Sequence, residues 1–303
     1  RFSSENLQGF VSCCGLITCD WVGAAAGEQL PSRVVLKIPS FLPLKRLNES
    51  MPPDQRMFDY DDAKWEEMAG ELNEIHNTEV ATYDFFEEFD GLAMPRKYYG
   101  KSVGTEAGGQ LCLEYMGNST MMGFHEAHTV GQLTQIARAL GKLQACSLKK
   151  EPSSPDLHKE FFENLGKTWS LEAWRGMFKG ILAFENSDQT KRILEQIDDL
   201  LPVYHASNLG STIHTQMSFR PVIVNGDMHT GNVLIDKDSG DLVALIDWQC
   251  THLGVGVEDL HRIALTALRA EERRAYTPIL IEKMYNSLVK NLDGAQAPYS
   301  LDT

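Results

Sequence analysis

Residues 222–249 carry the pattern that most restricts how this chain can fold. Three short apolar runs within it are typical of strands: Val222–Val224, Val233–Ile235 and Leu242–Ile246. The turn residues Lys237–Gly240 separate the second run from the third and predict a hairpin. Because short strands joined by tight turns return to the same place, we expect the polar residues that end these runs to meet at one edge of a small sheet.

Three oxygen-bearing side chains fall at that edge, those of Asp227, Asn232 and Asp247. Aspartates at strand ends often only cap the backbone, and any one of these residues alone would indicate a cap. Their order is more restrictive: Gly-Asp, four residues, Asn, an apolar run, a hairpin, an apolar run and Ile-Asp. This order is typical of the catalytic loop and metal-binding acid of kinase-like phosphotransferases. Oxygen ligands of this kind also suit Mg²⁺.

The catalytic stretch resembles a family of small-molecule kinases. It reads V-N-G-D-M-H-T-G-N-V-L-I-D and then L-I-D-W-Q, which is similar to the aminoglycoside phosphotransferase and choline kinase relatives. Trp248-Gln249 after Asp247 resembles especially the ecdysteroid-kinase-like (CHK kinase-like) branch. Asn225 stands where the family usually has His, a residue that supports the loop. This departure concerns the expected geometry of the loop more than the expected role of Asp227.

The resemblance implies an α+β, bilobal protein-kinase-like fold. We expect residues 1–116 to form a small β-rich nucleotide-binding lobe and residues 117–303 a larger, mainly helical lobe with the catalytic loop and the acceptor site. The 303 residues are enough for one large or two modest domains. Helical spacing after the boundary agrees with this division, for instance over Thr129–Leu148.

Lys37 lies inside the apolar strand Arg33–Pro39. This segment resembles the V-A-I-K strand of kinases, whose lysine contacts the α- and β-phosphates. A surface lysine on an edge strand would give the same pattern. The residues downstream at 222–249 favour the nucleotide-binding interpretation.

Glu79 is the expected partner of Lys37. Helical spacing places it on one face with apolar neighbours that include Ile75 and Phe86, and a carboxylate that faces a core needs a cation. The segment H-N-x-E-V-x-x-Y also resembles the corresponding helix of the CHK-like branch. Glu71 or Glu74 could take the same role, or Glu79 could be solvated.

Two further segments are assigned to the nucleotide. Residues 7–19 read as a strand, a turn at Gly9 and a second strand, and in the family such a hairpin covers the nucleotide with residues equivalent to Gly9, Phe10 and Ser12. A single glycine in a hairpin can also be only a turn. The run Leu111–Gly117 resembles the kinase hinge, which implies adenine contacts from the Glu114 carbonyl and the Met116 N–H.

Composition excludes some classes of partner. Lys+Arg 28 against Asp+Glu 42 gives a formal net charge of −14, which repels nucleic acid and anionic membranes. The acidity could favour a cationic substrate, although solubility explains it equally. No apolar run approaches the roughly 20 residues of a membrane span, and no secretory signal is visible. The six cysteines show no disulfide or metal-site spacing, so we expect a cytoplasmic protein.

Other segments receive structural interpretations. The Pro-, Asn- and Asp-rich residues 41–62 read as a surface excursion, and residues 252–257 as a glycine-rich loop. Asp259 resembles the family aspartate that braces the catalytic loop, and could also be a helix N-cap. His229 lies at a variable position of the family pattern and receives no role. The aromatic residues of 156–206 are either core or part of an acceptor site.

The sequence therefore predicts an ATP- and Mg²⁺-dependent kinase that phosphorylates a hydroxyl of a small acceptor, of the ecdysteroid-kinase-like type. A choline- or aminoglycoside-type kinase is the alternative within enzymes. A pseudokinase acting as a binding module is the alternative outside them. Asn225 and the poor glycine loop favour the pseudokinase, whereas retention of Lys37, Asp227, Asn232 and Asp247 opposes it.

Overall fold

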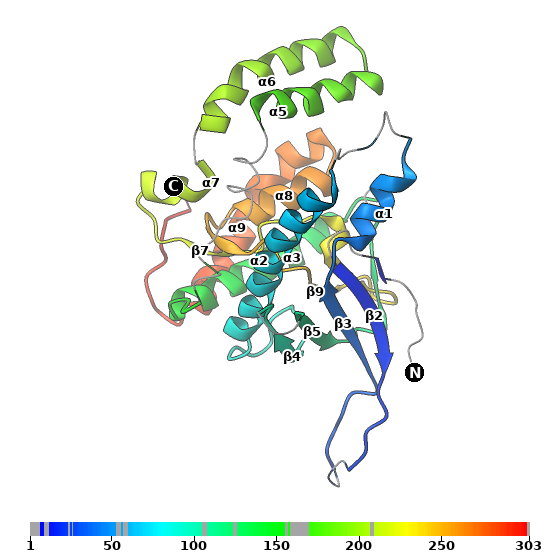
Figure 1. Cartoon of the computed structure of the whole chain (residues 1–303). Coiled ribbons are helices and arrows are strands. Elements are labelled where there is room, and N and C mark those ends of the chain that lie inside the picture. The colour runs from blue at the N-terminus through cyan, green and yellow to red at the C-terminus, as the bar shows by residue number, and fades with distance from the viewer. Residues whose placement is uncertain are drawn as a thin grey trace.

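The computed structural model describes residues 7–8, 12–23, 25, 27–52, 56, 60–104, 108–123, 126–154, 157, 170–206 and 209–301. An antiparallel sheet contains the strands between residues 7 and 114, and most of the remainder is helical (Figure 1). This is the α+β arrangement that the sequence predicts. Gly9 and Phe10, together with residues 158–169 of the expected helical region, lie outside the described residues.

The N-terminal sheet has the order β1-β2-β3-β5-β4. Its strands are β1 (Leu7–Gln8), β2 (Ser12–Thr18), β3 (Arg33–Pro39), β5 (Gln110–Glu114) and β4 (Lys97–Lys101), and every bonded pair is antiparallel. Strand β3 lies in the middle of the sheet, so Lys37 pairs in register with Cys14 on one side and Leu111 on the other. Lys37 is therefore not an edge-strand lysine.

Helix α2 (Asp62–Phe86) lies alongside this sheet (Figure 1). Asp61 caps it, because its side chain accepts a hydrogen bond from the Lys64 N–H. The predicted inward face is confirmed: Ile75, Glu79 and Phe86 are all buried.

Helix α1 (Leu42–Ser50) lies within residues 41–62, the expected surface excursion, and Asn48 is its buried residue. The surface position agrees with the prediction, but the helix was not expected, because Pro, Asn and Asp usually mark loops. Pro43 lies in the first turn of α1, where the missing N–H of proline has no intrahelical partner to lose. The residue that indicated a loop therefore starts a helix.

Helices make up most of the C-terminal region. They are α3 (Val130–Lys149), α5 (Leu171–Lys179), η3 (Gly180–Ala183), α6 (Asp188–Ala206), α7 (Leu209–Gln216), α8 (Glu258–Ala267) and α9 (Ala270–Asn291). The α5–α6 pair projects from one end of the molecule (Figure 1). Among the described residues, no helix is both long and apolar enough to cross a membrane.

The catalytic stretch forms short antiparallel strands. As predicted, three of them are β7 (Val222–Val224), β8 (Val233–Asp236) and β9 (Leu242–Leu245), with η4 (Thr230–Asn232) before β8. Strand β8 pairs with β9 and also with β6 (Ser119–Met121), which follows the expected hinge. The prediction of a glycine-rich loop at residues 252–257 is partly wrong, since His252–Gly254 forms β10 and pairs with β7. The division at residue 116 falls between β5 and β6 and stays a prediction.

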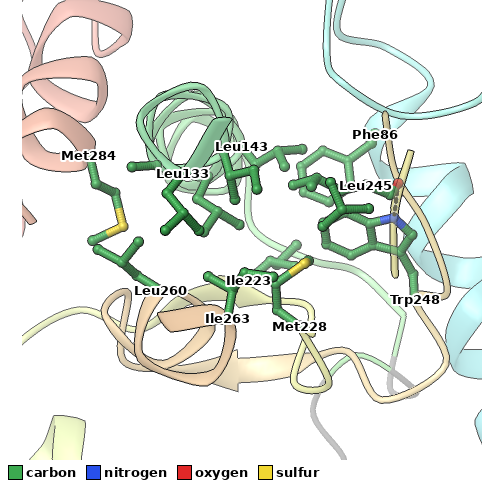
Figure 2. Close-up of a cluster of buried hydrophobic side chains, with 14 of the residues drawn as sticks. Phe86, Leu133, Leu143, Ile223, Met228, Leu245, Trp248, Leu260, Ile263 and Met284 are labelled. Atoms are coloured by element: carbon green, nitrogen blue, oxygen red, sulfur yellow. Dashed lines mark hydrogen bonds between the residues drawn. The ribbon is translucent and has the colours of Figure 1, made fainter. Parts of the chain in front are cut away.

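Ile223, Met228, Leu245 and Trp248 of this stretch are themselves part of the main core (Figure 2). Met228 and Trp248 are both essentially unexposed, and they immediately follow Asp227 and Asp247 in the chain. The Trp248 indole N–H donates to the Leu245 carbonyl at 3.1 Å, the dashed line of Figure 2. Each acid is therefore next to an anchored core side chain, and this fixes where its own side chain can point.

Candidate active site

Lys37 is the centre of the candidate site. Its Nζ lies 2.7 Å from Glu79 Oε2 and 2.6 Å from Asp247 Oδ1. Both Lys37 and Glu79 are buried, whereas the Asp247 side chain is 30% exposed. Burial alone would disfavour the ammonium, but the carboxylates of Asp247 and Glu79 outweigh it and raise the pKa of Lys37 above its ordinary value. Lys37 is therefore a fixed positive charge that joins β3, α2 and the end of β9.

Glu79 ties the helix to the catalytic stretch as well. Its Oε1 accepts a hydrogen bond from the Trp248 N–H at 3.3 Å, while Oε2 faces Lys37. Burial raises the pKa of Glu79, and the Lys37 ammonium opposes that shift. The expected Lys37–Glu79 pair is present, and Glu79 holds the lysine and the residue after Asp247 in one arrangement.

Asn225 organises the loop around Asp227. It is fully buried, and its Nδ2 donates to the Asp247 carbonyl at 3.0 Å and to the Ile246 carbonyl at 3.4 Å. Its Oδ1 accepts from the Asp227 N–H at 3.1 Å. The amide therefore links the two acids through their backbones. Asn225, at the position where the resemblance implies a histidine, thus supplies both a donor and an acceptor.

Asp259 braces the same loop from α8. Its carboxylate accepts from the N–H groups of Asn225 at 2.7 Å and Gly226 at 2.9 Å. Burial raises the pKa of Asp259 to about 6, which those two hydrogen bonds only partly oppose. The bracing contact is thus as predicted. The possible N-cap role is wrong, because Val257 holds the N-cap position and Asp259 lies in the first turn.

Gly226 leaves no room for a side chain at this point. Its φ is +81°, and a Cβ there would lie 2.2 Å from the Cys250 carbonyl oxygen. Asp247 also has a positive φ, +60°, a conformation that aspartate and asparagine tolerate better than most residues. Asp227 thus follows a glycine with positive φ, and Asp247 itself has positive φ. The surrounding contacts hold both conformations.

We expect Asn225→Asp to destabilise the fold by about 3 kcal/mol, because a buried charge would replace a donor and face two carbonyl oxygens. The substitution preserves the size of the side chain and the acceptor for the Asp227 N–H. Thermal and denaturant unfolding measure the change. The matched control is Asn286→Asp at an exposed position of α9, which should shift the unfolding free energy by less than about 0.5 kcal/mol. Equal effects of the two substitutions would contradict the bridging role of Asn225.

Asp227 is partly exposed, with 37% of its side chain accessible. Its Oδ2 lies 3.9 Å from His229 Nε2 and its Oδ1 lies 4.0 Å from Arg262 Nη1. Burial raises the pKa of Asp227, while His229 and Arg262 lower it. The carboxylate therefore has the Arg262 guanidinium and the His229 ring close by and stays accessible to an incoming group.

Asn232 and Asp247 are brought together by backbone pairing. The Asn232 carbonyl accepts from the Ile246 N–H at 3.0 Å, and Asn232 Nδ2 donates to the Asp227 carbonyl at 2.9 Å. With its nitrogen so engaged, the amide has its oxygen available as a ligand. Among the described residues no group of three His, Cys, Asp or Glu side chains could hold a metal. One carboxylate and one amide nevertheless fit Mg²⁺, which takes few protein ligands when it also binds substrate phosphates.

Of the remaining predicted nucleotide residues, Ser12 and Glu114 lie on the N-terminal sheet and Met116 lies just after it. Ser12 is buried at the start of β2, and its Oγ lies 3.6 Å from the thiol of Cys14, the register partner of Lys37. Glu114 ends β5, and its N–H donates to the Arg96 carbonyl at 2.8 Å. Met116 follows, and its carbonyl accepts from the Ser119 N–H at 3.1 Å. The structure thus puts Ser12 near the lysine strand and Glu114 and Met116 in the connection to β6.

A family model described as "Uncharacterized oxidoreductase dhs-27" matches residues 4–303. The chain belongs to this family, DUF1679. The uncharacterized kinase-like protein D1044.1 of Caenorhabditis elegans is 25% identical to this DUF1679 protein, over 98% of this chain and 75% of its own length. The predicted resemblance to ecdysteroid-kinase-like proteins is thereby confirmed at the level of the family.

Solved structures give more distant similarities. The GDP complex of wild-type aminoglycoside 2'-phosphotransferase-IIIa is 11% identical with a TM-score of 0.48, covering 95% of this chain and 83% of that one. Plasmodium vivax ethanolamine kinase is 10% identical with a TM-score of 0.45, covering 96% and 71%. The described part of the DUF1679 protein itself has a β-sheet N-terminal region and a helical C-terminal region.

Sequence reasoning missed three residues near Asp227, namely His252, Glu258 and Arg262. Glu258 Oε1 lies 3.3 Å from Arg262 Nε, and Glu258 Oε2 lies 3.3 Å from His252 Nε2. The spacing of Glu258 and Arg262, four residues apart on a helix, was one available signal. The resemblance of Asp259–Arg262 to the family's D-L-x-R pair was another, but it was used only for Asp259.

Proposed function

We propose that this DUF1679 protein is an ATP-dependent kinase that transfers the γ-phosphoryl group to a hydroxyl of a small acceptor. One observation carries the proposal: Lys37 is held by Glu79 and Asp247 at the edge where Asn225 links Asp247 to Asp227. A lysine and two acids with this connectivity meet the main needs of phosphoryl transfer, which are positioning and charge neutralisation.

Each residue then has a distinct task. Lys37, oriented by Glu79, binds the α- and β-phosphates. Asp227 accepts a hydrogen bond from the acceptor hydroxyl and takes its proton as the oxygen attacks the γ-phosphorus in line with the departing ADP. Asn232 holds the Asp227 carbonyl and thereby the loop. Gly9, Phe10 and Ser12 cover the nucleotide, and the Glu114 carbonyl and Met116 N–H bind the adenine.

Asp247 and Asn232 are the residues that would hold Mg²⁺. When bound there, the ion neutralises charge on the phosphate oxygens. Asp247 Oδ1 contacts Lys37 Nζ at 2.6 Å in this structure, and Glu79 Oε2 contacts the same ammonium at 2.7 Å. Lys37 would therefore keep a carboxylate partner if Asp247 held the ion.

The acceptor is proposed to be of the ecdysteroid type, a polyhydroxylated apolar molecule, on the resemblance of the Trp248-Gln249 pair to that branch. A choline- or aminoglycoside-type acceptor is the alternative. The six cysteines are all free thiols, which supports a reducing compartment such as the cytoplasm.

Two non-kinase functions fit the structure less well. A pseudokinase was favoured by Asn225, but this residue makes the loop contacts described above. An oxidoreductase, the word in the family description, would need a dinucleotide site, which is typically built on a parallel sheet with G-x-G-x-x-G. The sequence lacks this motif, and all bonded strand pairs in the described part of the chain are antiparallel.

A binding experiment separates the kinase from the oxidoreductase. We expect ATP to raise the melting temperature of the protein with Mg²⁺ present and much less in EDTA, because Asp247 and Asn232 bind the nucleotide through the metal. NAD and NADP serve as the comparison ligands and should give no shift. Stabilisation by NAD with none by Mg²⁺-ATP would favour the oxidoreductase, and no nucleotide response at all would exclude the kinase.

A further inference from the structure

Two residues of helix α8 lie against the catalytic loop, Asp259 and Arg262, and Arg262 has no role in the proposed function. Asp259 holds the backbone N–H groups of Asn225 and Gly226. Arg262, one turn later, faces the Asp227 side chain itself, with Nη1 at 4.0 Å from Oδ1. The helix is a rigid support, since Leu260, Ile263 and Ala264 are fully buried around these residues. The position of Arg262 relative to Asp227 is thus set by the core.

Arg262 is restrained by a second acid. Its Nε lies 3.3 Å from Glu258 Oε1, and Glu258 Oε2 lies 3.3 Å from Nε2 of buried His252. The other ring nitrogen of His252, Nδ1, lies 3.0 Å from the Cys250 carbonyl. Carbonyl and carboxylate oxygens only accept hydrogen bonds, so each ring nitrogen of His252 faces an acceptor. His252, Glu258, Arg262 and Asp227 therefore form one series of adjacent side chains.

The separation of Arg262 from Asp227 matters as much as its charge. A distance of 4.0 Å exceeds the roughly 2.7–3.2 Å of a hydrogen bond. The guanidinium therefore attracts the carboxylate without occupying its lone pairs, which stay available to an acceptor hydroxyl. Glu258 keeps the guanidinium from moving closer, because it holds the Nε side of the same planar group.

We infer that Arg262 is a positioning residue for the Asp227 carboxylate, and that Glu258, fixed by His252, holds Arg262 at its working distance. The inference rests on the proposed function, since it concerns the orientation of the base in phosphoryl transfer. Removal of Arg262 frees the carboxylate to rotate. Neutralisation of Glu258 lets Arg262 close onto Asp227 and compete with the acceptor.

The test compares Arg262→Ala and Glu258→Gln, singly and together, with Arg274→Ala, an exposed arginine of α9, as the control. We expect Arg262→Ala to lower kcat about 100-fold, the usual cost of misplacing a reacting group by about 1 Å, with unchanged KM for ATP and acceptor. Glu258→Gln should also lower kcat, but should add nothing in the Arg262→Ala background, because it acts through Arg262. Free guanidinium ions should restore part of the activity of Arg262→Ala, which a purely structural role would not allow.

Three results would overturn the inference. One is a normal kcat in Arg262→Ala, and another is a raised acceptor KM with normal kcat, which would make Arg262 an acceptor-binding residue. The third is multiplicative losses in the double variant. Wild-type protein without any phosphoryl transfer would instead remove the proposed function and this inference together. If Arg262→Ala does not fold, Arg262→Lys replaces it, and a normal kcat in Arg262→Lys and Glu258→Gln alike would also overturn the inference.

Discussion

Asp227→Asn should lower kcat about 10³-fold or more, within the range that a general base contributes, while ATP affinity stays unchanged. Asparagine has the shape of aspartate but does not take up the acceptor proton. The contacts that position residue 227 with Asn225 and Asn232 use its backbone N–H and carbonyl, so they survive the substitution. The loss therefore reports on the carboxylate and not on the loop.

The measurement is steady-state turnover beside a nucleotide-dependent melting shift. Asp241→Asn is the matched control, an exposed acid whose Oδ1 accepts from the Gln135 side chain at 2.7 Å. It should leave kcat unchanged. Turnover that survives in Asp227→Asn would remove the assignment of this residue as the base.

Asp247→Asn should abolish the Mg²⁺-dependent part of nucleotide binding. We expect the apparent affinity for Mg²⁺-ATP to fall more than about 100-fold, since even residues that only support a metal ligand cost about 10- to 100-fold when mutated. The backbone at residue 247 has φ +60°, which asparagine adopts readily. Lys37 keeps Glu79 as a partner, so the fold should persist.

Calorimetry or melting shifts at several Mg²⁺ concentrations test this. Asp293→Asn is a close control, because Asp293 also has a positive φ, +52°, and its carboxylate also pairs with a lysine, at 2.5 Å from Lys149 Nζ. That variant should bind Mg²⁺-ATP as the wild type does. An unchanged Mg²⁺ dependence in Asp247→Asn would show that the ion binds elsewhere.

Local patterns in the sequence predicted the elements that carry the site. Lys37 and Glu79 were paired correctly because each lies in a segment whose pattern is visible in the sequence. Lys37 is the charged residue inside an apolar strand, and helical spacing puts Glu79 on an apolar helix face. A buried carboxylate needs a cation, and Lys37 provides it. The strands β7, β8 and β9 followed from short apolar runs and a tight turn. These features depend on neighbours in the chain.

Other features that depend on contacts between distant residues were missed. Strand β10 exists because His252–Gly254 pairs with Val222–Val224, and its glycine-rich sequence indicated only a loop. The bridging role of Asn225 depends on carbonyls about twenty residues away in the chain. The His252–Glu258–Arg262 series required the packing of α8 against the loop. No spacing within the chain reveals such packing.

The most direct test of the central claim is transfer of the γ-phosphoryl group from ATP to a hydroxyl. Wild-type protein, Mg²⁺-ATP and a pool of steroid, glycoside, amino-alcohol and aminoglycoside acceptors are analysed by ³¹P-NMR and mass spectrometry, with Asp227→Asn in parallel. We predict one new phosphate ester and stoichiometric ADP with the wild type, and neither with the variant. An ester formed equally by both proteins, or no ester despite Mg²⁺-dependent ATP binding, would contradict the account.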